Sequence, residues 1–105
     1  SCYFIAKLAK KVIGYGCFWF IADEAQLMNI GVLPEYRRMG AAEKILKQGL
    51  EEAAERYMEV IFLEVRVSNL PAQSLYRKYN FQTVSVRQDV YELPRENGYI
   101  MSRKV

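Results

Sequence analysis

The sequence predicts an α+β domain with a mixed, mostly antiparallel sheet that contains one central pair of parallel strands. Residues 3–33 hold three runs rich in apolar, aromatic and β-branched side chains, joined by short polar turns, which is typical of an antiparallel meander. Residues 41–57 change to helical spacing, and residues 59–67 return to a strand-like run. A helix between two strands normally makes a crossover connection, so the strands that flank it are expected to be parallel.

The first three strands are expected at residues 3–9, 12–21 and 26–33. The polar pairs Lys10-Lys11 and Asp23-Glu24 are expected to form the turns between them. Pro34 should end the third strand, because proline has no backbone N–H to donate to a sheet.

The helix at residues 41–57 is expected to be a packing element. Its apolar side chains, among them Ile45, Leu46 and Leu50, recur at helical spacing and form one face. The opposite face is polar and includes Glu43 and Lys47, which are spaced to pair as i and i+4.

Residues 59–67 form the fourth strand, and their apolar density predicts a buried central position. Ser68 and Asn69 are expected to cap a second helix that runs to about Tyr79, with Asn80 in the left-handed conformation beyond its end.

The last two strands are expected at residues 81–91 and 99–104. The residues between them, 92–98, contain Asn97-Gly98, a dipeptide that favours a tight turn between antiparallel strands.

Composition excludes several classes of function. The chain has 105 residues, 51% of them hydrophobic and 26% charged, which predicts a single globular domain over residues 1–105. No apolar run approaches the roughly 20 residues needed to span a bilayer. The net charge of +3 is too small and too scattered to indicate nucleic acid. We therefore expect neither nucleic acid nor membrane among its partners.

The absence of histidine from the sequence restricts the chemistry further. It removes Ser–His and Cys–His nucleophile pairs and most zinc sites, so no metal is expected. The two cysteines, Cys2 and Cys17, lie in strand-like runs and are expected to be buried or half-buried thiols in a reducing, cytoplasmic compartment. Acid–base chemistry would have to use carboxylate, tyrosine, lysine or cysteine side chains.

The loop before the first helix is the most informative stretch. It consists of Arg37, Arg38, Met39, Gly40, Ala41 and Ala42. A turn here points backbone N–H groups outward at the positive end of the helix dipole, which makes an anion site. Gly40 lets the backbone approach an anion closely, and the two arginines can add charge-assisted contacts to phosphate. The alternative is a solvated basic helix end with no ligand.

Two side chains could carry acid–base chemistry. Glu64 interrupts an apolar strand, and alternation puts it on the same face as Arg66, so it is either a general base or one half of an ion pair with that arginine. Tyr76 shares a helical face with Asn69 and Gln73. It is either a proton donor to a departing thiolate or a packing tyrosine.

Several segments together resemble the GNAT acetyltransferases. The pattern Arg-x-x-Gly-x-Ala at residues 37–42 is similar to the pyrophosphate loop of that family. Residues 63–69 and 75–81 look like the second half of its N-terminal acetyltransferases, and residues 23–32 and 34–37 look like the first half. Within the family the chain looks most like the bacterial ribosomal-protein-alanine acetyltransferases, with the archaeal N-terminal acetyltransferases next.

The resemblance implies that an acetyl group passes directly from acetyl-CoA to the α-amino group of a protein, with a ribosomal protein that begins with alanine as the expected acceptor. The parallel strands would splay around acetyl-CoA, Glu64 would act as base, and Tyr76 would protonate the sulfur of the cofactor. The implied cofactor contacts come from the third strand, the loop and the second helix: Ile30, Gly31, Val32, Arg37, Arg38, Met39, Gly40, Ala41, Ala42, Asn69, Gln73 and Tyr76.

The family normally has a strand and two helices before the position that matches Ser1, so the chain is expected to be N-terminally incomplete, with a complete acetyl-CoA half and an incomplete acceptor half. Two rival functions stay open. One is acetyl transfer to a lysine side chain or a small amine. The other is a non-catalytic module that binds acyl-CoA or a partner protein.

Overall fold

The structure, a computed structural model, describes the backbone of residues 2–105 and the side chains of residues 4–105. In chain order its elements are β1 (Cys2–Leu8), β2 (Lys11–Ile21), β3 (Glu24–Val32), the short 3-10 helix η1 (Pro34–Tyr36), α1 (Ala41–Glu55), β4 (Val60–Arg66), α2 (Leu70–Lys78), β5 (Gln82–Glu92) and β6 (Arg95–Lys104).

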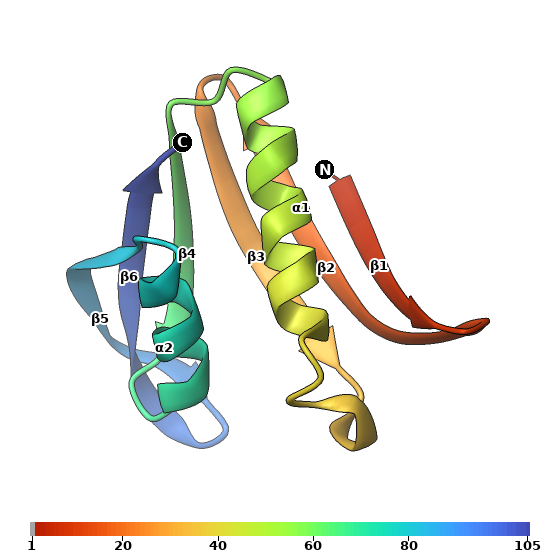
Figure 1. Ribbon diagram of the computed structural model, residues 1–105. Coiled ribbons are helices and arrows are strands. Elements are labelled where there is room, and N and C mark those ends of the chain that lie inside the picture. Colours follow the sequence, from red (N-terminus) through yellow and green to blue (C-terminus); the bar gives the residue numbers. More distant parts are fainter. Residues whose placement is uncertain (1) are drawn as a thin grey trace.

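The strands form one sheet in the order β1-β2-β3-β4-β6-β5 (Figure 1). β3 and β4 run parallel, and the other neighbouring strands are antiparallel. The predicted α+β class, the meander and the central parallel pair are therefore confirmed.

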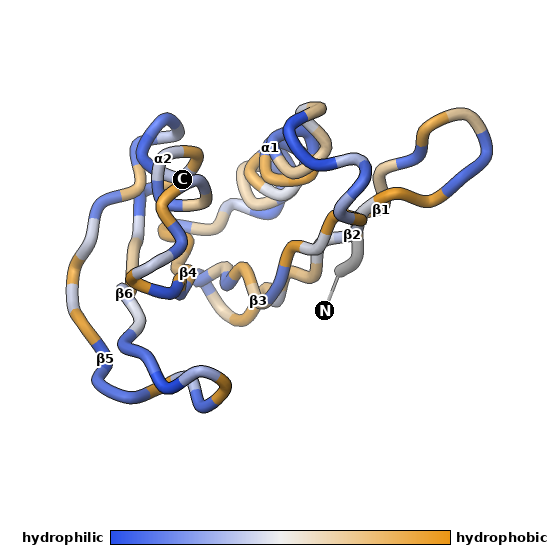
Figure 2. The backbone as a smooth tube through the Cα atoms, turned by 90° about the horizontal axis from the view of Figure 1, so that it is seen from below, coloured by the Kyte–Doolittle hydropathy of each residue, from blue (hydrophilic) through white to orange (hydrophobic). Residues whose placement is uncertain are grey.

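Both helices cover the same face of the sheet, which we call the helix side; the opposite face is the open face (Figures 1 and 2). On this face α1 packs on β1, β2 and β3, whereas α2 lies farther along the sheet, beside β4. The molecule thus has a first half, made of β1–β3 and α1, and a second half, made of β4–β6 and α2.

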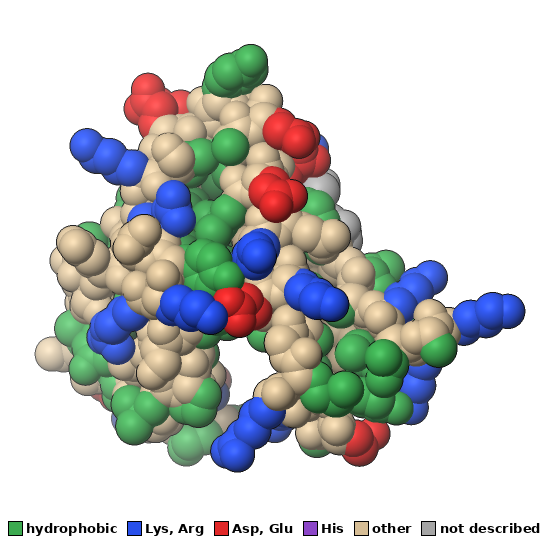
Figure 3. Space-filling view, in the orientation of Figure 1, with side chains coloured by type: hydrophobic (Ala, Val, Ile, Leu, Met, Phe, Trp, Pro, Cys, Tyr) green, Lys and Arg blue, Asp and Glu red, His purple; other side chains and the backbone are tan. Residues whose placement is uncertain are grey.

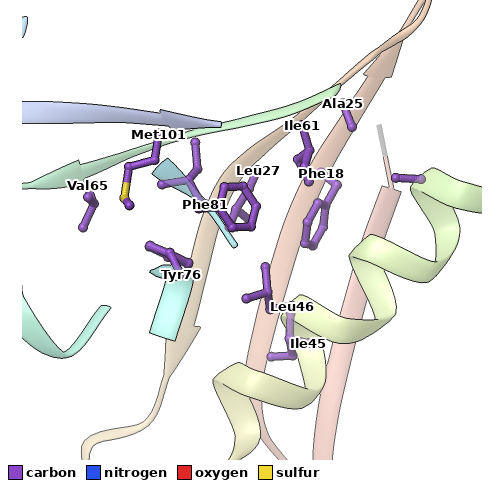
Figure 4. Packing of buried hydrophobic residues seen from close by; sticks show 12 residues of the cluster. Phe18, Ala25, Leu27, Ile45, Leu46, Ile61, Val65, Tyr76, Phe81 and Met101 are labelled. Atoms are coloured by element: carbon purple, nitrogen blue, oxygen red, sulfur yellow. The ribbon is translucent and has the colours of Figure 1, made fainter. Parts of the chain in front are cut away.

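The core lies between the sheet and the helices, as Figure 4 shows. Its largest fully buried side chains are Phe18, Phe81, Ile45, Leu46, Ile61 and Met101. A Cβ added at Gly49 of α1 would lie 2.2 Å from Cζ of Phe18, so glycine there lets the helix approach the ring closely. β4 alternates between half-buried and buried side chains, which puts Phe62, Glu64 and Arg66 on the open face as predicted.

The two halves separate where β3 and β4 part. The two strands pair over only four positions, from Glu24–Val60 to Leu27–Leu63, although both continue for several residues. At the same level the register of β2 against β3 shifts by one residue, so that Met28 is the extra residue of a β-bulge. A bulge adds twist to its strand, which explains why β3 turns away from β4 beyond Leu27.

The predicted turn at Asn97-Gly98 is wrong. β5 and β6 meet around Leu93-Pro94, and β6 begins at Arg95. Asn97 lies within β6, opposite the register shift of β5 between Arg87 and Tyr91. Its Oδ1 accepts a hydrogen bond of 2.9 Å from the backbone N–H of Asp89, inside that shift. The dipeptide that favours a turn is used here within a strand.

Other local predictions are confirmed. Asn69 caps α2, its Oδ1 accepting from the backbone N–H of Ala72, and Asn80 has a φ of 71° just after that helix. Cys17 is a buried free thiol; the side chain of Cys2 lies outside the described residues. Neither described helix has the length and apolar character that a membrane crossing requires.

Candidate functional site

A cavity of about 650 Å³ lies on the helix side, between the start of α1 and the start of α2. We call it the helix-side cavity. Its lining comes from the end of β3, the loop before α1 and one face of α2: Ile30, Val32, Tyr36, Arg37, Arg38, Gly40, Ala41, Ala42, Glu43, Asn69, Pro71, Ala72, Leu75 and Tyr76. Its size is that of a typical small-molecule site.

One end of this cavity is the N-terminus of α1. Gly40 is the N-cap residue, with φ of 82°, and no side chain caps the helix. The first α-helical hydrogen bond runs from the N–H of Lys44 to the carbonyl of Gly40. The amides of Ala41, Ala42 and Glu43 therefore have no partner within the helix. A Cβ at Gly40 would meet nothing within 4 Å, so this group of amides is open to an approaching anion.

The two arginines of the loop differ in their surroundings. Nε of Arg37 donates to the backbone carbonyl of Val32 at 3.3 Å, which ties the loop to the end of β3. Arg38 has a positive φ of 67° and lines the cavity beside Gly40. Both bring positive charge to the wall that contains the α1 amides, and this favours a phosphate-bearing ligand.

Tyr76 lies on the opposite wall, on α2. Its side chain is 9% exposed and makes an edge contact with the ring of Phe81. Burial, with a smaller contribution from the phenol of Tyr91, raises the pKa of Tyr76 to about 12. The phenol is therefore fully protonated at neutral pH, which is the form that can donate a proton.

The raised pKa of Tyr76 predicts a loss of stability at high pH. Below pH 10 the phenol is protonated in the folded and unfolded states alike, and between pH 10 and 12 only the unfolded state gives up the proton. This costs about 1.4 kcal/mol at pH 11 and about 2.7 kcal/mol once the folded state also ionises.

Urea unfolding at pH 9, 10 and 11 measures this effect. The wild type should lose about 1.4 kcal/mol more than Tyr76→Phe between pH 9 and 11, because the variant has no phenol at position 76 to ionise. Tyr57→Phe, at a position that is 89% exposed, is the matched control and should follow the wild type. An equal loss of unfolding free energy in Tyr76→Phe and the wild type would contradict the raised pKa of Tyr76.

Glu64 lies on the open face, where it lines a second cavity of about 580 Å³. The lining of this open-face cavity comes from β3, β4, β5 and β6: Glu24, Gln26, Leu27, Met28, Phe62, Leu63, Glu64, Arg87, Tyr91 and Ile100. Oε2 of Glu64 lies 3.3 Å from Nη1 of Arg87. The predicted alternative partner, Arg66, instead pairs with Glu96 at 3.1 Å and stacks over the ring of Tyr91.

The two predicted acid–base groups thus lie on opposite faces of the sheet. The separation of β3 and β4 beyond Leu27 and Leu63 lies between them. Figure 3 shows an opening between the two halves of the molecule, viewed from the helix side. A ligand held in the helix-side cavity can therefore expose a reactive group toward Glu64 through this separation.

Not every predicted cofactor contact lines the helix-side cavity. Gly31 and Met39 lie outside its lining, and Met39 is 55% exposed. Gln73 is 3% exposed, and its Nε2 donates to the carbonyls of Arg66 and Val67 at 3.0 Å each. Because these bonds fasten α2 to the end of β4, we leave Gln73 out of the proposed cofactor site.

Sequence reasoning missed the residues that surround Glu64. Met28 marks the β-bulge, and Arg87 and Tyr91 reach the open-face cavity from β5. The pairing of β5 with β6, which lies next to β4, brings these two residues near Glu64. Nothing in their local sequence pattern signals that proximity; only the strand order does.

Comparison with known proteins agrees with this architecture. Residues 1–81 match the acetyltransferase (GNAT) family. An N-alpha-acetyltransferase of Saccharolobus solfataricus is 37% identical over 114 residues, covering 96% of this chain and 68% of the relative. A ribosomal protein bS18-alanine N-acetyltransferase of Haemophilus ducreyi is 34% identical over 95 residues, covering 88% and 66%.

The crystal structure of the ribosomal-protein-S18-alanine N-acetyltransferase from Escherichia coli has the same fold, with a TM-score of 0.93 and 30% identity over 99% of this chain and 68% of that one. The chain spans about two thirds of the length of these relatives. With a family match over residues 1–81, the chain belongs to the acetyltransferase (GNAT) family.

Proposed function

We propose that this chain transfers an acetyl group from acetyl-CoA to the α-amino group at the N-terminus of a protein. The observation that carries the proposal is the helix-side cavity, which joins an anion site at α1 to the protonated Tyr76 on α2 and adjoins the separation of β3 and β4. Relatives named for acetylating the alanine of ribosomal protein bS18 make a ribosomal protein that begins with alanine the proposed acceptor.

The lining of the helix-side cavity fits acetyl-CoA as the donor. The amides of Ala41 and Ala42 suit the diphosphate, since they have no partner within the helix and lie at its positive end. β3 is unpaired with β4 beyond Leu27, so backbone groups near Ile30 and Val32 can bind the amide-bearing arm of the donor as an added strand would. Acetyl-CoA supplies a thioester whose carbonyl carbon accepts the amine.

The proposed reaction is balanced by the two acid–base groups. Glu64 takes one proton from the α-ammonium group of the acceptor, and the neutral nitrogen attacks the thioester carbonyl carbon. A C–N bond forms and the C–S bond breaks, while Tyr76 gives its phenolic proton to the departing thiolate. The nitrogen then loses its second proton, which returns through solvent to the phenolate of Tyr76, and Glu64 releases the first proton to solvent, so both side chains regain their starting states.

Peptides that differ in their amines test the proposal. A peptide with a free N-terminal alanine is expected to be acetylated, as read by mass spectrometry. The same peptide with a blocked α-amine and an internal lysine is expected to stay unmodified. The assay is run on the 105-residue chain and on the product of the complete reading frame. Transfer to lysine or to a polyamine alone would favour the small-amine rival, and acetyl-CoA binding without transfer in either protein would favour a binding module.

A further inference from the structure

Three side chains join the two helices beside the helix-side cavity, and one of them, Glu43, also belongs to the lining of that cavity. Glu43 belongs to the first turn of α1, while Lys78 and Tyr79 lie at the end of α2. Oε2 of Glu43 accepts a hydrogen bond of 2.8 Å from Nζ of Lys78 and a second, short one from the phenol of Tyr79. Among the described side chains, these are the hydrogen bonds that connect α1 to α2. We call the three residues the interhelix clasp.

The position of Glu43 makes this arrangement informative. A carboxylate in the first turn of a helix is favoured near the unpaired N–H groups of that turn. Here the side chain instead reaches across to the other half of the molecule. The hydrogen bonds from Lys78 and Tyr79 lower the pKa of Glu43, and the hydrogen bond to Glu43 raises the pKa of Lys78, so both groups are charged at neutral pH. The carboxylate is thereby kept partnered by α2 at the edge of the anion site.

The clasp connects the two halves of the molecule at the level where their strands are no longer paired. The backbone pairing of β3 with β4 covers four positions and ends at Leu27 and Leu63, above the separation. The α1 amides lie on one side of the separation and Tyr76 on the other. A ligand that contacts both must find them at a fixed distance, and misplacement by about 1 Å is enough to lower a rate by roughly 10².

We propose that Glu43, Lys78 and Tyr79 are positioning residues that set the distance between the anion site on α1 and Tyr76 on α2. The inference rests on the proposed function, because it concerns the same cavity and the same donor. A donor that spans the cavity binds best when both walls are held in place beforehand. An anion that touches α1 alone gains nothing from the clasp.

This difference separates positioning from a purely electrostatic role. If Lys78 served only to neutralise Glu43 beside the anion site, its removal would weaken pyrophosphate as well as coenzyme A, and removal of the uncharged Tyr79 phenol would weaken neither. If they hold the two walls together, their removal weakens only ligands that reach both walls. Coenzyme A reaches both, and inorganic pyrophosphate fits at α1 alone.

Lys78→Met and Tyr79→Phe are the test variants, and Lys47→Met is the matched control. Lys47 contributes positive charge near Glu43 without a hydrogen bond, so its removal changes the net charge as Lys78→Met does but leaves the clasp intact. Coenzyme A affinity is measured by calorimetry. Pyrophosphate affinity is measured by NMR titration of the Ala41 and Ala42 amides, and thermal unfolding verifies that each variant is folded.

Each clasp variant is expected to bind coenzyme A about tenfold more weakly and to lower kcat for an alanine peptide. Tyr79→Phe, which leaves the charges of Glu43 and Lys78 in place, is expected to bind pyrophosphate within twofold of the wild type. Lys47→Met should change none of these, and Lys78→Arg, which keeps the charge and the donor, should restore coenzyme A affinity. If Tyr79→Phe weakens the binding of both ligands equally, or changes neither affinity, the proposed positioning role of the clasp is wrong, whereas the proposed function still stands. Absence of coenzyme A binding by the wild type would overturn both.

Discussion

Replacement of Glu64 by glutamine is expected to lower the turnover of an alanine-terminated peptide by roughly 10² while leaving acetyl-CoA affinity nearly unchanged. Glutamine keeps the size and hydrogen-bonding shape of the side chain but cannot accept the proton of the acceptor ammonium. Because Glu64 lines the open-face cavity and not the helix-side cavity, its replacement should leave the affinity for acetyl-CoA nearly unchanged. Steady-state kinetics with the peptide and calorimetry with acetyl-CoA measure the two quantities.

Glu24→Gln is the matched control for this prediction. Glu24 is a second carboxylate in the lining of the open-face cavity, but it lies at the start of β3, where that strand is still paired with β4. Glu24→Gln removes the same charge from the same cavity as Glu64→Gln does. If the position of the carboxylate, and not the charge of the cavity, decides the effect, turnover in Glu24→Gln should stay within about threefold of the wild type. Equal losses of turnover in the two variants would assign the effect to the charge of the cavity. Wild-type turnover in Glu64→Gln would show that Glu64 is not the general base.

The contact between Glu64 and Arg87 was beyond sequence reasoning. The alternation of β4 places Glu64 and Arg66 on one face, which made their ion pair the obvious alternative. In the structure each has a partner from the β5–β6 pair: Arg87 for Glu64 and Glu96 for Arg66. Those partners are 23 and 30 residues away, and the pairing follows from β6 lying next to β4. A pattern within one strand carries no information about that neighbour.

The local features around α1 and α2 could be predicted because each depends on a few neighbouring residues. Asn69 caps α2 through a bond to an amide three residues away, and Gly40 takes the positive φ that the turn before α1 requires. Asn97-Gly98 shows the limit of the same reasoning. The dipeptide is compatible with a turn, but the bond from Asn97 to Asp89 and the register of β5 against β6 override the local preference.

The separation of β3 and β4 was expected from the family resemblance, whereas its physical cause became visible only in the structure. The glycine of β3, Gly31, lies three residues beyond Met28 and is paired in regular register, so the sequence does not mark the position of the bulge. The bulge arises from how β3 pairs with β2, where Phe18 is opposite Leu27 and Cys17 is opposite Asn29. This single extra residue lies where the pairing with β4 ends, which is where the two strands begin to separate.

Replacement of Gly40 by aspartate is expected to abolish acetyl-CoA binding. A Cβ at this position would meet nothing within 4 Å, so the added side chain does not crowd the protein. It does place a carboxylate beside the α1 amides that the diphosphate would use. At a separation of ~5 Å and an effective dielectric constant of ~20, the repulsion between two unit charges is about 3 kcal/mol, which corresponds to a loss of affinity of more than 100-fold.

Gly40→Asn is the control that isolates the charge. Asparagine has nearly the same shape as aspartate, and both tolerate the positive φ of 82° better than other non-glycine residues. Any backbone strain or loss of open space is therefore shared by the two variants. Calorimetry should give a loss of at most about tenfold for Gly40→Asn and more than 100-fold for Gly40→Asp. Unchanged affinity in Gly40→Asp would show that the phosphates bind elsewhere, whereas equal losses in both variants would mean that glycine is needed for its backbone alone.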